Sequence, residues 1–84
     1  MAVRVLILED NPVARSFLCR VVRESFSDAD RISEAGDLES ARAQIAATRP
    51  PGALPTDAFR LILVDLELPD GSGLELLAEL AGYP

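Results

Sequence analysis

The feature that most constrains the fold is a run of four aliphatic residues, Leu61–Val64, that ends directly in a carboxylate, Asp65. A loop with the sequence LELPDGSG follows, and an apolar helical segment comes after it. A short, continuous aliphatic run is typical of a strand buried on both faces, as parallel strands are in α/β proteins. Open α/β sheets bind their ligands beyond the carboxyl ends of the strands. Asp65 therefore occupies the position where such a sheet would place a site.

Two further segments predict strands that could pair with this one. Residues 3–8, written VRVLIL, are aliphatic and β-branched, and they also end in acids, Glu9 and Asp10. Residues 31–35, written RISEA, predict a more polar strand of the kind found at sheet edges. Helical segments alternate with the three strands, and a β-α-β-α-β-α order predicts a parallel sheet with right-handed crossovers. We expect the strand order 2-1-3.

Helix-capping residues and apolar spacing predict the three helices. Asn11-Pro12 can open the first helix, Asp37 the second and Ser72 the third. The residues expected to face the sheet are Val13, Phe17, Leu18, Val21 and Val22, then Leu38, Ala41 and Ile45, and finally Leu74, Leu77, Leu80 and Ala81. The segments expected to link or end these helices are a polar turn at 27–30, an exposed loop at 50–57, and Gly82.

Composition excludes several classes of function. The chain has 84 residues, enough for one small domain, and its net charge of −6 argues against nucleic acid or an anionic membrane as a direct partner of this segment. It contains no His, and all eight basic residues are Arg, which excludes His-dependent catalysis and lysine Schiff bases within these residues. The one cysteine, Cys19, lies in an apolar segment and is interpreted as a small hydrophobe. No run approaches the ~20 apolar residues of a membrane span, so we expect a cytoplasmic protein.

Acids at the ends of two neighbouring strands predict a cation site. Because the carboxyl ends of adjacent parallel strands lie together, Glu9, Asp10 and Asp65 should meet in one cleft, with Glu67 at its rim. Carboxylates about 4–5 Å apart repel by a few kcal/mol per pair at an effective dielectric constant near 20. Either some are protonated or a cation offsets the repulsion, and oxygen ligands in an open site suit Mg²⁺. Singly, each acid could be a turn former or a helix cap; their combination favours a shared site.

Three residues in the loop after Asp65 have a simpler interpretation. Asp70, Gly71 and Gly73 are expected to turn the chain and to permit close approach of the backbone. The segment matches neither of the glycine-rich patterns that cradle phosphates.

Taken together, these residues resemble the receiver domain of two-component response regulators, which has a flavodoxin-like (CheY-like) α/β fold with a three-layer parallel sheet. The resemblance rests on the acid pair Glu9-Asp10, on Asn11-Pro12 after it, and on the sequence VDLELPDGSGLELL around Asp65. It covers the whole chain but only the first three of the family's five βα units. It implies that residues 1–84 are a C-terminally truncated receiver domain and the amino-terminal part of a longer regulator.

The resemblance also implies a role for each acid. Asp65 matches the phosphoacceptor, which takes a phosphoryl group from the phosphohistidine of a sensor kinase. Asp10 matches a direct Mg²⁺ ligand, Glu9 matches its neighbour, which is usually Asp, and Glu67 matches the position whose backbone carbonyl ligates the ion. The implied function is Mg²⁺-dependent phosphotransfer in a phosphorelay that regulates transcription, without turnover of an external substrate.

Two groups on which receivers rely are missing from these 84 residues. The family uses a Ser or Thr after the fourth strand and a Lys after the fifth, and the chain has no Lys. With those strands missing, the edge of the strand at Leu61–Val64 should be uncovered and should drive self-association. A DNA-binding output domain would lie beyond residue 84.

Two other functions remain open from the sequence. Phosphohydrolases that form an aspartyl phosphate resemble D-x-D-x-T, whereas this chain has Glu67 in place of the second Asp and Pro69 in place of Thr. A pseudo-receiver, which serves as an interaction or dimerisation module and is never phosphorylated, would need neither the Ser or Thr nor the Lys.

Overall fold

The computed structural model describes residues 3–26, 31–48 and 58–81. Three parallel strands form one sheet: β1 (Arg4–Leu8), β2 (Arg31–Ala35) and β3 (Leu61–Val64), in the order β2-β1-β3. In register, Leu8 of β1 lies beside Ala35 of β2 and Val64 of β3, so all three strands end at one rim. The predicted strand order and the flavodoxin-like α/β architecture are confirmed.

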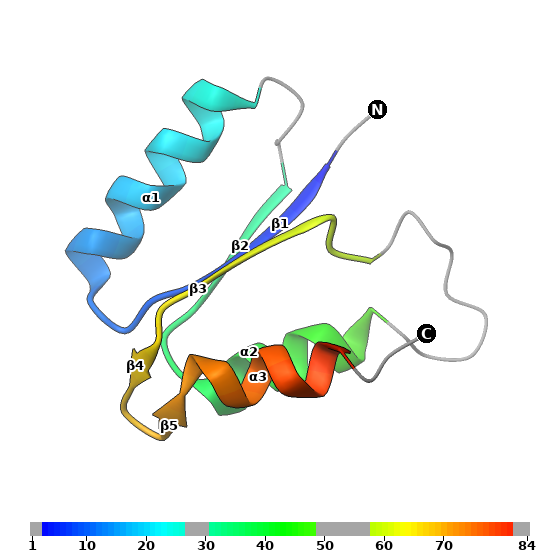
Figure 1. Cartoon of the computed structure of the whole chain (residues 1–84). Helices are drawn as coiled ribbons and strands as arrows, with labels where there is room; N and C mark the ends of the chain where they lie inside the picture. The colour runs from blue at the N-terminus through cyan, green and yellow to red at the C-terminus, as the bar shows by residue number, and fades with distance from the viewer. Residues whose placement is uncertain (1–2, 27–30, 49–57, 82–84) are drawn as a thin grey trace.

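Helices cover both faces of the sheet (Figure 1). Helix α1 (Pro12–Ser25) lies on one face, whereas α2 (Leu38–Ala47) and α3 (Gly73–Ala81) lie side by side on the other. Three predicted features lie outside the described residues: the turn at 27–30, the loop at 50–57 and the helix end at Gly82. None of the described helices is long and apolar enough to cross a membrane.

Strand β1 forms the centre of the core because its side chains alternate between the two helical layers. Val5 and Ile7 pack with Cys19 and Val22 on the α1 side. Leu6 and Leu8 pack on the other side with buried residues of β2, α2 and α3, which are Ala35, Leu38, Ala41, Ile45 and Leu76. The four apolar residues of β1 are at most 1% exposed. By contrast, all four residues of β3 are only partly buried, as an edge strand would be.

The predicted sheet-facing stripe of α1 is partly wrong. Val22 is buried and Leu18 packs against the core, but Val13 is 78% exposed and Phe17 is 61% exposed. The inward row runs instead through Arg15, Leu18, Cys19 and Val22, which recur at the three- and four-residue spacing of one helix face. The first residue of this row, Arg15, is polar. A prediction from apolar side chains alone therefore chose the wrong face at the start of the helix.

The predicted face of α3 is also partly wrong. Leu76 is buried and Leu80 packs against the core, whereas Leu74 is 60% exposed and Leu77 is 44% exposed. Helix α3 is apolar on several sides, so periodicity alone could not choose the buried one. The apolar face predicted for α2 is confirmed, since Leu38, Ala41 and Ile45 are all buried.

The loop between β3 and α3 contains a feature that was predicted only as a turn. Two short antiparallel strands, β4 (Glu67–Leu68) and β5 (Gly71–Ser72), form a small hairpin directly after Asp65. The hairpin lies at the end of the sheet where the strands terminate, beside the first turns of α2 and α3 (Figure 1). The hairpin therefore forms one wall of the candidate site.

Candidate metal and phosphoacceptor site

Backbone hydrogen bonds bring the acids of the two strands to the same rim. The ladder of the sheet continues one residue beyond the strands: Glu9 N–H donates to the carbonyl of Ala35 over 3.0 Å, and Asp65 N–H donates to the carbonyl of Leu8 over 2.9 Å. The backbone of Glu9 and of Asp65 is thus held by the sheet itself. This juxtaposition follows from two aliphatic strands that each end in acid and pair in parallel.

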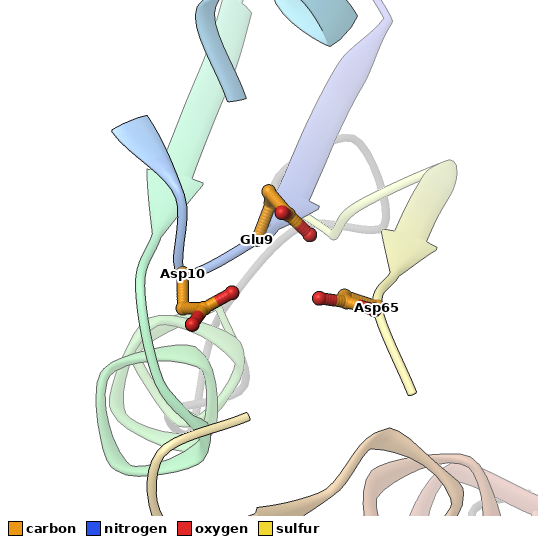
Figure 2. Close-up of side chains that lie close together, drawn as sticks. All are labelled: Glu9, Asp10 and Asp65. Carbon is orange, nitrogen blue, oxygen red and sulfur yellow. The ribbon is translucent and has the colours of Figure 1, made fainter. Parts of the chain in front are cut away.

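Three carboxylates converge at this rim. One oxygen from each of Glu9, Asp10 and Asp65 lies within 4.8 Å of the others. Figure 2 shows the three side chains pointing into the same space, two from the chain just after β1 and one from the chain just after β3. Glu9 and Asp65 are partly buried, and Asp10 is exposed. The structure therefore brings together three of the four residues named from the sequence.

The electrostatics of the cluster are those of crowded like charges. The pKa of Glu9 is raised above its usual value, first because its carboxyl group hydrogen-bonds that of Asp65, then by partial desolvation and by repulsion from the Asp65 charge. A proton held by Glu9 is one way to relieve that repulsion, and a bound cation is another. The donor set is all oxygen and open to water, which fits Mg²⁺ better than a softer metal.

The fourth residue, Glu67, lies on the wall of the site, with its side chain exposed. Its backbone N–H points to the Asp65 carboxylate, 3.4 Å from Oδ1, which ties the start of the hairpin to the acid. An open hollow of about 530 Å³ lies here, lined by Asp10, Asp65, Leu66, Glu67, Leu68 and Pro69. The hollow is large enough to admit a hydrated ion and a phosphoryl group beside the carboxylates.

Gly73 fixes the distance between α3 and the backbone of Asp65. A Cβ at this position would overlap the carbonyl oxygen of Asp65 and would lie 2.6 Å from a methyl carbon of Val64. Gly73 N–H also donates to the carbonyl of Leu66 over 3.0 Å. The close backbone approach expected at this glycine is therefore present, and it packs the first residue of α3 directly against the site.

Sequence reasoning missed the part that Arg15 plays beside the site. Its Nη1 donates to the carbonyl oxygen of Glu9 over 2.7 Å, and its Nε donates to Oε1 of Glu34 on β2 over 3.2 Å. Arg15 thus fixes the peptide between the two acids that follow β1. Its spacing from Leu18, Cys19 and Val22 was the available signal, since it places Arg15 on the inward row near the amino end of the helix.

Sequence reasoning also missed the partners of Asp70, which had been interpreted only as a turn former. The Asp70 carboxylate accepts the backbone N–H groups of Leu38 and Glu39 over 2.8 and 3.0 Å. These bonds, the Leu38 bond first, lower the pKa of Asp70 below its usual value. Gly71 next to it has φ of +152°, a conformation that L side chains rarely adopt. No local sequence signal connects residues 70 and 38.

A bacterial regulatory protein is similar in sequence to most of this chain. The transcriptional regulatory protein CitB of Klebsiella pneumoniae is 36% identical over 76 residues, which are 90% of this chain and 28% of that protein. The chain therefore spans a little over a quarter of the length of this curated relative. No family model matches the chain, and no solved structure matches it significantly.

Sequence and fold together fit a response-regulator receiver domain. The parallel sheet has the order expected for such a domain, and the similarity to a transcriptional regulator extends over nearly the whole chain. The cluster of Glu9, Asp10 and Asp65 lies at the carboxyl rim of this sheet, where open α/β folds bind ligands. The chain is thus similar in sequence to part of a transcriptional regulatory protein, and its sheet fits a receiver domain.

Proposed function

We propose that the chain is the phosphoacceptor receiver domain of a two-component response regulator. In this proposal Asp65 accepts a phosphoryl group from the phosphohistidine of a sensor histidine kinase. The observation that carries the proposal is the convergence of three carboxylates, from two neighbouring strands, within 4.8 Å at the rim of a receiver-type sheet. The similarity to a transcriptional regulatory protein supports the signalling context.

The residues present fit a divalent cation. Asp10 and Asp65 would hold Mg²⁺ through carboxylate oxygens, Glu9 would complete the acidic set directly or through water, and Glu67 would contribute its backbone carbonyl. When bound, the ion offsets the negative charge that gathers between a carboxylate nucleophile and a phosphoryl group. The raised pKa of Glu9 supports this assignment, because it marks a crowding of negative charge that a cation would relieve.

The transfer itself is a substitution at phosphorus. An oxygen of the ionised Asp65 carboxylate attacks the phosphorus atom, an O–P bond forms, and the P–N bond to the imidazole breaks. The imidazole nitrogen leaves with the electron pair and takes up a proton from solvent. The product is an aspartyl phosphate, so the chain acts as a phosphoacceptor and does not turn over an external substrate.

Incubation with acetyl phosphate and Mg²⁺, followed by mass spectrometry, tests the proposal. We expect the mass of one phosphoryl group to be added at Asp65, as an acid-stable adduct that hydroxylamine removes. The variant Asp65→Asn should gain nothing, and Glu24→Gln, which removes an exposed acid outside the cluster, should still be labelled. A chain that remains unlabelled under saturating acetyl phosphate, although folded, would overturn the proposal.

The same experiment separates two competing functions. A phosphohydrolase would release inorganic phosphate continuously from a phosphomonoester, and Asp65→Asn would abolish the release. A pseudo-receiver would take no label but would still associate with itself or another protein. The exposed apolar side chains of Leu66, Leu74 and Leu77 favour the second of these competitors over the first.

The proposal also concerns partners and location. Self-association through β3 is part of it: among the described residues, no strand pairs with the edge of β3 that faces away from β1. Sedimentation at several chain concentrations would detect such dimers. A DNA-binding output domain in the same regulator is consistent with the regulatory relative, and the buried free thiol of Cys19 is consistent with the cytoplasm.

A further inference from the structure

The amino end of α2 is capped by two aspartates that come from different parts of the chain. The first two amides of the helix, those of Leu38 and Glu39, donate to the two carboxylate oxygens of Asp70. The next amide donates to the side chain of Asp37, and the one after it donates to the carbonyl of Asp37. The bond from Ala41 to the carbonyl of Asp37 is the first hydrogen bond of the helix itself. Side chains therefore satisfy three of the N–H groups that a helix leaves unpaired at its start, those of Leu38, Glu39 and Ser40. Asp37 directly precedes the helix, whereas Asp70 lies more than thirty residues further along the chain.

The distant cap belongs to the loop that builds the site. Asp70 lies in the turn between β4 and β5, and that hairpin starts at Glu67, two residues after Asp65. The Asp70 carboxylate therefore bridges the wall of the acidic site and a helix on the same face of the sheet. Charge-assisted hydrogen bonds of this kind, together with the positive end of the helix dipole, are stronger than bonds between neutral groups.

The hairpin packs closely against α2 around the hydrogen bonds of Asp70, so these bonds can fix the position of the hairpin. A Cβ on Gly71 would lie 2.8 Å from a methyl carbon of Leu38, so the hairpin backbone rests directly against the first turn of α2. Leu68, at the other end of the hairpin turn, packs against the core cluster that contains Leu38. Further along, Arg42 of α2 forms an ion pair with Glu79 of α3, at 2.8 Å. The hairpin and the two helices are thus linked at several points.

We infer that Asp70 is a positioning residue, which anchors the hairpin on the amino end of α2 and so holds Glu67 and Asp65 in place to face Glu9 and Asp10. The inference rests on the proposed function for its metal readout but adds a residue that the proposed function does not use. Asp37 supplies a matched control, because its side chain caps the same helix through the N–H of Ser40 and comes from the residue directly before the helix. Loss of either cap weakens α2, but only loss of Asp70 releases the wall of the site.

The first measurement is the dissociation constant for Mg²⁺, determined by calorimetric titration on the wild type, Asp70→Ala and Asp37→Ala. We expect both variants to unfold at lower urea concentration. Asp70→Ala should bind Mg²⁺ about tenfold more weakly, as is typical when a partner that orients a ligand is lost, whereas Asp37→Ala should stay within about twofold of the wild type. Asp70→Asn keeps one accepting oxygen and should lie between, and it decides the result if Asp70→Ala does not fold.

The second measurement needs no metal. Amide hydrogen exchange in the metal-free chain should accelerate at Glu67 and Leu68 in Asp70→Ala and in Asp70→Asn, but not in Asp37→Ala. Failure of the wild type to bind Mg²⁺ would overturn the proposed function. Hydrogen exchange in the metal-free chain would still decide the role of Asp70. If the wild type binds Mg²⁺, and the Asp70 variants bind it equally well and protect the hairpin amides as the wild type does, the role assigned to Asp70 is overturned.

Discussion

Replacing Asp10 by Asn should change folding stability and cation binding in opposite directions. The structure places a carboxylate oxygen of Asp10 within 4.8 Å of an oxygen of Glu9 and of Asp65. Coulomb's law for unit charges at that separation gives about 0.9 kcal/mol per pair in water and about 3.5 kcal/mol at an effective dielectric constant of 20. Because Asp10 is exposed, the lower figure applies, and its two pairs sum to about 1.7 kcal/mol of repulsion.

Removing this repulsion stabilises the fold, but part of the gain in stability is lost at helix α1, which follows Asp10. A negative charge near the amino end of α1 is favourable by about 0.3–1 kcal/mol, and the Asn side chain does not supply it. The metal-free Asp10→Asn variant should therefore be about 1 kcal/mol more stable than the wild type. For a chain of this size, that shifts the urea midpoint upward by about 1 M. Added Mg²⁺ should stabilise the wild type, as any ligand of the folded state does, and should stabilise the variant much less.

Urea unfolding followed by circular dichroism, with EDTA and then with Mg²⁺, measures both effects. Glu24→Gln is the control, since it removes an exposed acid of α1 that is not part of the cluster. It should leave the response to Mg²⁺ unchanged. The reasoning is refuted if Asp10→Asn is no more stable than the wild type in EDTA and responds to Mg²⁺ as the wild type does, because the three acids would then not share an electrostatic site.

Three further predictions concern packing and pH. Gly73→Ala should destabilise the fold by about 3 kcal/mol or more because its Cβ overlaps backbone, whereas Gly36→Ala, with 3.4 Å to its nearest neighbour, should be tolerated in the same urea assay. Leu76→Ala removes a buried side chain and should cost about 2–5 kcal/mol, while Leu74→Ala, at an exposed position, should cost under about 1 kcal/mol. Folding lowers the pKa of Asp70, so the stability that its carboxylate gives the fold is complete above the ordinary pKa of about 3.9 and is lost as pH falls through the folded-state pKa. Acid titration of stability should accordingly be shallower in Asp70→Asn, and equal slopes would contradict the assigned cap.

The sequence was sufficient to predict the sheet because its strands are dominated by one strong signal. The aliphatic run before Glu9 is fully buried, and residues 61–64 form a strand as predicted, although at the edge of the sheet they are only partly buried. Parallel pairing followed from the alternation with helices. The helix faces were harder to predict. In α1 the inward row begins with Arg15, and α3 offers Leu74, Leu76 and Leu77 to more than one side. Apolar periodicity cannot choose a face when a polar residue points inward or when leucines surround the helix.

The same contrast applies to the site. The convergence of Glu9, Asp10 and Asp65 was predictable, because the ends of adjacent parallel strands must meet. The supports of that cluster were not, because they depend on contacts between distant segments. Asp70 reaches α2 only once the hairpin is placed beside it. Arg15 reaches the carbonyl of Glu9 only once α1 lies on the sheet.

Titration of Mn²⁺ into the isotope-labelled chain, followed by nuclear magnetic resonance, tests most directly whether acids from two strands share one cation. Mn²⁺ accepts the same oxygen ligands as Mg²⁺ and broadens the signals of nearby amides. Broadening should begin at Glu9, Asp10 and residues 65–67, and it should fade from all of them together in Asp10→Asn. Broadening centred on the helix acids Glu75 and Glu79, with the amides at the rim of the sheet unaffected, would contradict the shared site.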